Sequence, residues 1–163
     1  MIRFVTLPPA ALDALIAGDL AAASAAAGQQ LSEFLVAERW LWELRRDQIA
    51  HDPASAPWIA RAAVAEPPGV VVGHAGFHGP PDADGVVEVG YSVDPAYRRR
   101  GYAKAMLAAL IERAQADPAV RVIRASISPD NVASLATIAG FGFVRVGEQW
   151  DAEDGLELVF ERA

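Results

Sequence analysis

The chain has 163 residues, of which 53% are hydrophobic and 21% charged, and its formal net charge is −7. This length and globular composition suit one domain over residues 1–163, and the acidic balance argues against a nucleic-acid partner, which would need a basic face. The absence of cysteine excludes disulfides, thiolate metal sites and cysteine nucleophiles. Because no apolar run reaches the length of a membrane span and no secretory signal is evident, we expect a cytoplasmic protein with no membrane partner.

Hydrophobic periodicity and the positions of proline and glycine predict alternating strands and helices. In chain order we expect a strand over residues 3–7, a helix opened by Pro8-Pro9, a helix over 21–27, a helix over 33–49, strands over 58–65, 70–77 and 86–93, a helix entered at Gly101, a strand over 120–127, a short helix after Asn131, a strand over 140–146, an acidic loop over 148–155 and a strand over 156–161. A crossover helix separates the strands over 86–93 and 120–127, so these two should be parallel. The predicted fold class is therefore mixed α/β (α+β), with a central and largely antiparallel sheet.

The stretch from Tyr91 to Leu110 is the most informative part of the sequence. A strand with alternating apolar residues ends at Val93, and an amphipathic helix begins after Arg98-Arg99-Arg100-Gly101. A glycine at a helix start lets a ligand approach closely, the N–H groups of the first turn are free, and the helix dipole and the arginines add positive charge. These features predict a pyrophosphate site, and a solvated basic turn is the alternative.

This segment resembles the acyl-CoA signature of the GNAT superfamily, the acyl-CoA-dependent N-acyltransferases. The signature is Gln/Arg-x-x-Gly-x-Gly/Ala between the fourth strand and the following helix, and here it reads Arg98, Gly101 and Ala103. The strand before it and the helix after it are the context that the signature requires.

A second stretch downstream also looks like a GNAT pattern, Asn-x-x-Ser…Gly-Phe. Asn131 and Ser134 supply the first part, and Gly142-Phe143 supplies the second. Asn131 can equally be read as a helix cap, and the two readings are compatible because a cap lies at a helix start. The resemblance is strong from about residue 86 to residue 143 and weak outside that range.

The resemblance implies a sheet of six to seven strands flanked by about four helices, with the fourth and fifth strands splayed apart and acetyl-CoA in the gap as acetyl donor. It implies no metal, and a homodimer is one expectation because dimers are common in the family. Backbone groups of the fourth strand would pair with the pantetheine arm and polarise the thioester carbonyl. The residues that it assigns to cofactor binding are Tyr91, Ser92, Val93, Arg98, Arg99, Arg100, Gly101, Tyr102, Ala103, Lys104, Asn131 and Ser134.

Glu88 is our candidate for the general base. A lysine-like acceptor is an ammonium near neutral pH and must lose a proton before it attacks the thioester, and a nearby carboxylate can receive that proton. The run Glu-Val-Gly-Tyr that starts at Glu88 resembles the branch of GNATs that acetylates protein N-termini or small amines and antibiotics. A strand glutamate that faces solvent is the alternative, and His74 and His78 are weaker candidates for the base.

One position departs from the family pattern. Many GNATs place a tyrosine seven residues after the motif asparagine, as general acid for the leaving thiolate, and here that position is Ile138. The thiolate would then take a proton from water, from Ser134 or from Tyr91, and the sequence leaves these three open.

We therefore expect an N-acetyltransferase that transfers the acetyl group of acetyl-CoA to a primary amine, on a small molecule or a peptide N-terminus. A non-catalytic CoA-binding regulatory module is the alternative, and an α/β domain whose basic turn binds an ordinary anion is a third reading. Trp40 and Trp42 could line an acceptor pocket, although packing onto the sheet suits at least one of them. The loop over 150–154 puts three carboxylates beside an indole, which suits a cationic amine as well as a solvated acidic turn.

Overall fold

A computed structural model describes residues 1–163. It contains seven strands and six α-helices, joined by two short 3₁₀ turns. In chain order the elements are β1 (Ile2–Val5), α1 (Pro9–Ile16), α2 (Leu20–Ala27), α3 (Glu33–Ala37), α4 (Arg39–His51), β2 (Arg61–Ala65), β3 (Val70–Phe77), β4 (Val86–Val93), α5 (Tyr102–Gln115), β5 (Val122–Ile127), α6 (Val132–Ile138), β6 (Val144–Asp151) and β7 (Gly155–Arg162). No helix is both long and apolar enough to cross a membrane.

All seven strands form one sheet in the order β1-β2-β3-β4-β5-β7-β6. The neighbours β4 and β5 are parallel, as α5 crosses over between them, and every other neighbouring pair is antiparallel. The mixed α/β prediction with a mainly antiparallel sheet is thereby confirmed, as is the parallel pair at its centre.

The two central strands separate after a short paired segment. β4 and β5 pair only where Val86, Val87 and Glu88 face Val122, Ile123 and Arg124. From Val89 onward β4 pairs with β3 alone, and β5 pairs with β7. One edge of β4 therefore has no strand partner from Val89 to Val93, in the middle of the sheet, and this opening is the expected splay.

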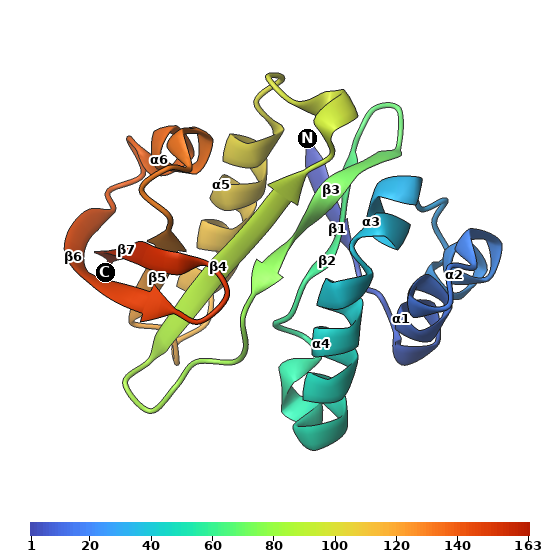
Figure 1. The fold of residues 1–163 in the computed structure, drawn as a ribbon, viewed down its shortest axis with the longest axis horizontal. Helices are drawn as coiled ribbons and strands as arrows, with labels where there is room; N and C mark the ends of the chain where they lie inside the picture. Colours follow the sequence, from blue (N-terminus) through green and yellow to red (C-terminus); the bar gives the residue numbers. More distant parts are fainter.

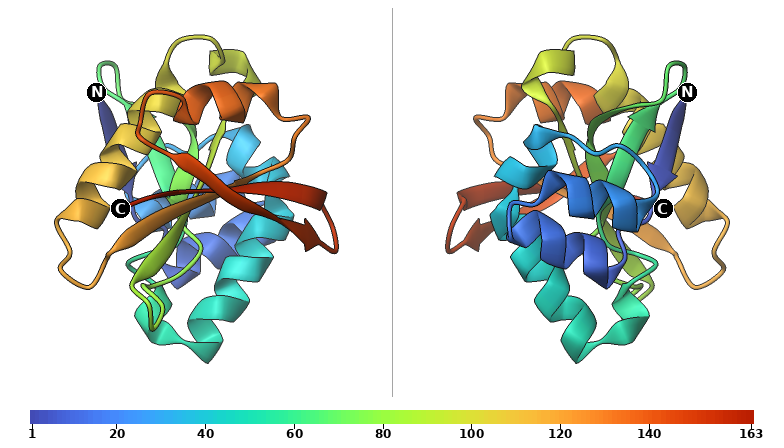
Figure 2. Two further views of the ribbon diagram at one scale, coloured as in Figure 1. Left: turned by 90° about the vertical axis from the view of Figure 1, so that its left-hand side faces the viewer. Right: turned by 90° about the vertical axis from the view of Figure 1, so that its right-hand side faces the viewer.

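Helices cover both faces of the sheet (Figures 1 and 2). On one face α1 to α4 pack over β1 to β3, and Trp42 and the leucines of α1 are fully buried there. On the other face α5 packs over β1, β3 and β4, and Met106, Leu107 and Leu110 are buried there. Strand residues alternate between the two cores, as the period of two requires. The helices of the first face lie beside β4 rather than over it (Figure 1).

The helix expected over 33–49 is two helices, which brings the number of helices to six rather than about four. The chain leaves helical geometry at Glu38, where φ is −87° and ψ is 32°. The carbonyl of Leu35 accepts from the N–H of Glu38 over 3.1 Å in the tight turn at the break, and the indole N–H of Trp42 donates to the same oxygen over 2.6 Å. Nothing local in the sequence marks this break, because Glu38 is an ordinary helix former.

The last hairpin also differs from the prediction. β6 begins at Val144 rather than at residue 140, because Gly140 and Gly142 have φ values of 88° and 79° and form turns. It then continues to Asp151, so residues 148–151 are strand and only residues 152–154 form the turn. β6 is exposed along nearly all of its length, and this gives it no apolar alternation from which its extent could be predicted. β2 begins at Arg61, later than expected, because a turn occupies residues 56–59.

Candidate functional site

The N-terminus of α5 forms one end of the site. Gly101 is the N-cap in a left-handed conformation with φ of 83°, and no side chain caps this helix. The N–H groups of the first turn have no partner inside the helix. A Cβ added to Gly101 would meet no atom within 4 Å, so the space beside its Cα is open, and Gly101, Tyr102 and Ala103 line the groove. The helix dipole makes this space favourable for an anion.

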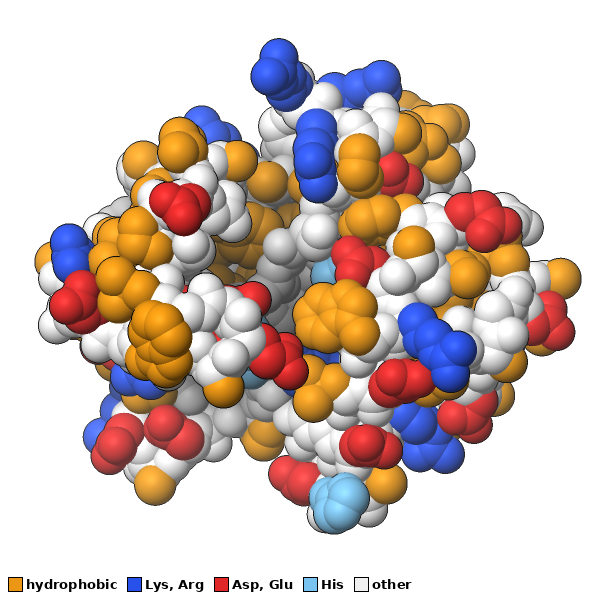
Figure 3. Space-filling model, in the orientation of Figure 1, with side chains coloured by type: hydrophobic (Ala, Val, Ile, Leu, Met, Phe, Trp, Pro, Cys, Tyr) orange, Lys and Arg blue, Asp and Glu red, His pale blue; other side chains and the backbone are white.

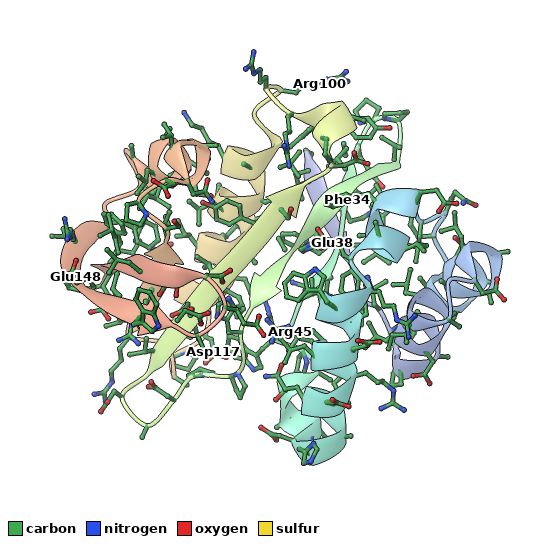
Figure 4. The ribbon with its side chains drawn as sticks, viewed as in Figure 1. Phe34, Glu38, Arg45, Arg100, Asp117 and Glu148 are labelled. Atoms are coloured by element: carbon green, nitrogen blue, oxygen red, sulfur yellow. The ribbon has the colours of Figure 1, made fainter.

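Two of the three arginines line a groove at this helix start, together with Lys104. Arg98 is extended, and its Nε lies 3.4 Å from the carbonyl oxygen of Val93, while Arg99 adopts a left-handed conformation with φ of 63°. Arg100 is not among the residues that line the groove. Its guanidinium stacks on the Tyr97 ring at 5.5 Å, and Figure 4 places it at the top of the molecule.

The groove runs from the basic turn along the free edge of β4 and has a volume of about 740 Å³. Its lining contains eleven of the twelve residues predicted for cofactor binding, Arg100 being the exception. The lining residues are Tyr91, Ser92, Val93, Tyr97, Arg98, Arg99, Gly101, Tyr102, Ala103, Lys104, Asn131, Ala133, Ser134 and Thr137. A basic anion site at one end and an unpaired strand edge beside it are what the pyrophosphate and the pantetheine amides of acetyl-CoA require, so the residues present fit this cosubstrate.

α6 forms the wall opposite β4. Its N-cap is Asn131, whose side-chain oxygen accepts a hydrogen bond from the N–H of Ser134 over 3.1 Å. The asparagine is therefore a helix cap and a groove residue at once. Ile138 lies on the opposite side of the same helix and is buried in the core against α5. The position of the family's tyrosine thus supplies no polar group here.

Tyr91 stands where the groove meets a second hollow. Its hydroxyl is buried and makes no hydrogen bond, although Ser134 and Thr137 lie next to it. Burial raises the pKa of Tyr91 above its ordinary value, and the two neighbouring hydroxyls oppose this only in part. The phenol therefore stays protonated at neutral pH, with only the Ser134 and Thr137 hydroxyls beside it.

The second hollow, of about 440 Å³, lies over the open face of β4. Its lining comes from β4, β5, the loop after β3, the start of α6 and the last hairpin, namely His78, Val89, Gly90, Tyr91, Ala125, Ser126, Ile127, Ser128, Asn131, Ser134, Asp154 and Glu157. Tyr91, Asn131 and Ser134 line the groove as well. The space-filling view shows a cleft along the centre of this face with acidic side chains on both walls (Figure 3).

Glu88 sits at the point where β4 and β5 separate. One oxygen, Oε2, lies 2.7 Å from Nδ1 of His78, and Oε1 accepts a hydrogen bond from Ser126 Oγ over 3.1 Å. Burial by itself raises the pKa of Glu88, but the hydrogen bond and charge of His78, with Ser126 and Arg124, outweigh it and hold the pKa below its ordinary value. Glu88 is thus an anion at neutral pH. Its side chain is half-buried and both of its oxygens have hydrogen-bond partners, so it does not face solvent freely.

The other sequence candidates lie apart from this cluster. His74 is buried, stacked on Phe34 at 5.8 Å and edge-on to Trp42 at 5.5 Å, with Nε2 3.6 Å from Glu38. Trp42 is fully buried and is not available to an acceptor, whereas Trp40 is 59% exposed and donates to Glu38 over 2.8 Å. Figure 4 shows Phe34 and Glu38 on the side of α3 and α4 that faces the central strands.

Several residues of the site carried no recognisable signal. Ser126 and Gln149 join Glu88 in a chain of hydrogen bonds, since Gln149 Nε2 lies 3.2 Å from Ser126 Oγ and 3.1 Å from Glu157 Oε1. These residues come from β5, β6 and β7, and only the sheet order brings them together. His78 could have been paired with Glu88 from the sequence, because the two flank the turn of an antiparallel hairpin.

Comparisons with known proteins agree with this geometry. A family model described as "Acetyltransferase (GNAT) family" matches residues 23–143. The chain is 35% identical over 74 residues to YjdG, an uncharacterized N-acetyltransferase of Bacillus subtilis (strain 168), and this match covers 45% of the chain and 44% of YjdG. The chain therefore matches less than half of the length of that relative.

Solved structures share the whole fold. The aminoglycoside acetyltransferase AAC(6')-Ib, solved with coenzyme A, superposes with a TM-score of 0.68 at 17% identity, over 100% of this chain and 95% of that one. A ribosomal-protein-alanine N-acetyltransferase of Brucella melitensis superposes with a TM-score of 0.59 at 26% identity, over 99% and 98% of the two chains. The family match extends over most of the 163 residues and confirms the resemblance read from the motifs, so the protein belongs to the acetyltransferase (GNAT) family.

Proposed function

We propose that this protein transfers the acetyl group of acetyl-CoA to a primary amine on a small molecule or a peptide N-terminus. The observation that carries the proposal is the groove, in which a basic helix start and the free edge of β4 lie end to end. Phosphates bind at the helix start, and an extended amide chain pairs with a strand edge. The thioester then arrives near Tyr91, where the groove opens into the hollow.

The donor end of this reaction requires positioning and polarisation. Backbone N–H groups of β4 on the free edge are rigid donors for the thioester carbonyl, and such donors stabilise the oxyanion that develops as the amine attacks. Tyr91 is our candidate for the acid that protonates the leaving thiolate, because its hydroxyl has no other partner and stays protonated. It would replace from β4 the tyrosine that this family commonly carries at the position of Ile138.

The acceptor end is the hollow over β4. Its carboxylates, Asp154 and Glu157, and the anionic Glu88 beside them suit a protonated amine. AAC(6')-Ib has been solved with ribostamycin and with kanamycin, and the Brucella relative is described as acting on a ribosomal-protein alanine. Small polyamines of the aminoglycoside type and peptide N-termini are therefore the two acceptor sets to compare.

The direct test is release of free CoA thiol from acetyl-CoA, followed with a panel of amines and N-terminal peptides. We expect turnover with at least one acceptor, and a rise in melting temperature with acetyl-CoA alone, because a ligand selective for the folded state stabilises it. Stabilisation by acetyl-CoA without thiol release across the panel would favour the regulatory module, and the absence of both effects would refute the proposal.

Removal of the Tyr91 hydroxyl tests the acid. We expect Tyr91→Phe to lower kcat by about tenfold to a hundredfold while the acetyl-CoA Kd stays the same, since a positioned acid contributes at least about that much. Tyr102→Phe is the matched control, because Tyr102 lines the same groove without reaching the hollow. Steady-state kinetics and calorimetric binding give the two quantities. An unchanged kcat in Tyr91→Phe would assign the proton to water or to Ser134.

The acidic hairpin tests the acceptor side. Asp151 caps its own turn, since its Oδ1 accepts from the N–H groups of Glu153 and Asp154 over 2.8 Å each, and it does not line the hollow. We expect the double change Asp154→Asn with Glu157→Gln to raise the acceptor KM several-fold at low salt and less at about 0.1 M salt or above, where charges are screened over about 10 Å. The acetyl-CoA KM should not move. Glu153→Gln is the control, since Glu153 does not line the hollow. An acceptor KM that is equal in the double variant and the wild type would remove these carboxylates from the acceptor site.

A further inference from the structure

We infer that His78 is the general base of the transfer, through its Nε2 atom, and that Glu88 positions and charges the imidazole rather than taking the proton itself. The inference rests on the proposed function and assigns a separate role to each member of the Glu88–His78 pair. Glu88 and His78 lie on either side of the turn between β3 and β4, with Nδ1 and Oε2 2.7 Å apart.

The carboxylate is poorly placed to act alone. Both of its oxygens already have partners, His78 on one and Ser126 on the other. To accept a proton from an ammonium, Glu88 would have to give up one of these hydrogen bonds. Its lowered pKa also makes it a weaker base than an ordinary glutamate.

The hydrogen bond to Glu88 fixes the tautomer of His78. An ionised carboxylate only accepts hydrogen bonds, so Nδ1 must carry the hydrogen, and the neutral ring then has its lone pair on Nε2. The side chain of His78 is 49% exposed, so Nε2 can be reached from the hollow. A base whose other nitrogen is held by a carboxylate is the arrangement that orients an imidazole and stabilises the imidazolium that forms.

Gly90 makes room for the His78 ring. A Cβ built on Gly90 would lie 3.1 Å from Nε2 and 3.4 Å from Cδ2 of His78. The reactive edge of the ring therefore lies over the strand position that carries no side chain, one residue before Tyr91. Because successive residues of a strand face opposite sides of the sheet, the base and the proposed acid reach the hollow from opposite faces of β4, and both His78 and Tyr91 line it.

Hydrogen bonds fix the position of His78 through its backbone carbonyl as well as through its side chain. From α4, Gln48 donates to the carbonyl of His78 over 2.7 Å and Arg45 lies 3.4 Å from the same oxygen. The charged groups that face the pair are Arg45 from α4, Glu88 from β4, Arg124 from β5, and Asp154 and Glu157 from the last hairpin. The carboxylates among them favour a cationic acceptor, while the two arginines oppose it.

Nε2 takes one proton from R–NH₃⁺, and the amine lone pair then forms the C–N bond with the thioester carbonyl carbon. The C–S bond breaks with its electron pair on sulfur, and the thiolate gains one proton while the nitrogen loses its second. The imidazolium returns its proton to solvent, so the products are the amide, the CoA thiol and one released proton.

The test compares pH profiles of kcat at saturating acceptor, which report groups that titrate in the complex. An imidazole base loses activity as the pH falls through about 6.5, whereas a carboxylate base loses it only below about 4.5. We expect the first profile in the wild type, and a kcat lower by at least about a hundredfold in His78→Gln with the acetyl-CoA Kd unchanged. His51→Gln is the control, because His51 is exposed and bonds only to the carbonyl of Asp47. A wild-type limb near pH 4.5, or a His78→Gln kcat within about threefold of the wild type, would overturn the inference.

A second measurement needs no turnover. In ¹⁵N-labelled protein we expect the imidazole of His78, identified by its loss in His78→Gln, to carry its hydrogen on Nδ1, and this signature should weaken in Glu88→Gln. A hydrogen on Nε2 would refute the role of His78 even if the enzyme is active. Failure of the proposed function would look different: no CoA thiol would be released, while the hydrogen would still be on Nδ1. Gly90→Ala places a methyl group against Nε2. This change should lower kcat by about tenfold and leave the affinity for acetyl-CoA unchanged. An unchanged kcat in Gly90→Ala would count against approach over this strand position.

Discussion

A Gly101→Val protein should bind acetyl-CoA at least about a hundredfold more weakly than the wild type and should show no rise in melting temperature when the thioester is added. The structure gives two reasons. The space beside the Gly101 Cα is empty to 4 Å, and Gly101 lines the groove at the start of α5, so a valine side chain would occupy the place expected for the pyrophosphate. The groove also loses the close backbone approach that a helix-start anion site requires.

The same change strains the backbone, and the strain needs its own control. The φ of 83° at Gly101 costs any L-residue about 1–2 kcal/mol, and a β-branched one at least that much. Gly18 has a φ of 77°, also meets no atom within 4 Å, and lies between α1 and α2, outside the groove. We expect Gly18→Val and Gly101→Val to lose similar stability, and only Gly101→Val to lose binding. Wild-type affinity for acetyl-CoA in a folded Gly101→Val protein would show that the phosphates do not bind at this turn.

The sequence predicted the centre of the fold best, where local signals agree with one another. Between β4 and α5 the alternation of the strand, the turn residues and the helical spacing all point to the same arrangement, and the crossover rule gives the parallel pair. The splay itself could not be derived from periodicity, because Val86 to Val93 reads as one continuous strand. It became an expectation only through the resemblance to the family.

Elements whose shape depends on distant contacts were predicted least well. The break at Glu38 depends on the contact of Trp42 with Leu35 and on the neighbouring His74, and no turn residue announces it. The extent of β6 depends on pairing with β7, since its own residues are exposed along the strand. Propensity is a weak prior in both cases, and tertiary structure overrides it.

The site residues also divide into those that a local pattern could predict and those that only distant contacts bring together. Ten of the twelve cofactor residues follow one another along the chain from β4 into α5, and Asn131 and Ser134 belong to a second motif at the start of α6. Two motifs could therefore name the whole set, and the one residue that does not line the groove, Arg100, is distinguished only by its stacking on Tyr97. The surroundings of Glu88 depend on the order of the strands. Ser126 is 38 residues away along the chain, and no local pattern links the two.

The role of Glu88 can be tested by a change that keeps its shape and removes its charge. Glu88→Gln keeps the shape of the side chain, and its amide can still accept from His78 and donate to Ser126, so the protein should fold. We expect kcat to fall by about a hundredfold and the acetyl-CoA Kd to stay within about twofold, because the charge that orients the imidazole and stabilises its protonated form is gone. Glu161→Gln is the control, since Glu161 holds Arg124 through a comparable charged hydrogen bond but lies outside the hollow. Wild-type turnover in Glu88→Gln would mean that the Glu88–His78 pair does not supply the general base.

Stability against pH separates the catalytic from the structural role of Glu88. Its pKa is lowered in the folded state, so its contribution to the free energy of unfolding is present above the unfolded value of about 4.3 and is lost as the pH falls through the folded value. Urea unfolding should therefore show the wild type losing stability below about pH 4.3 more steeply than Glu88→Gln, and the part of the difference that comes from the carboxylate itself should be constant between pH 6 and pH 8. The activity difference should follow a different course and persist across that neutral range. Parallel loss of stability and activity at neutral pH would mean that Glu88 acts by holding β4 and β5 together, and not through His78.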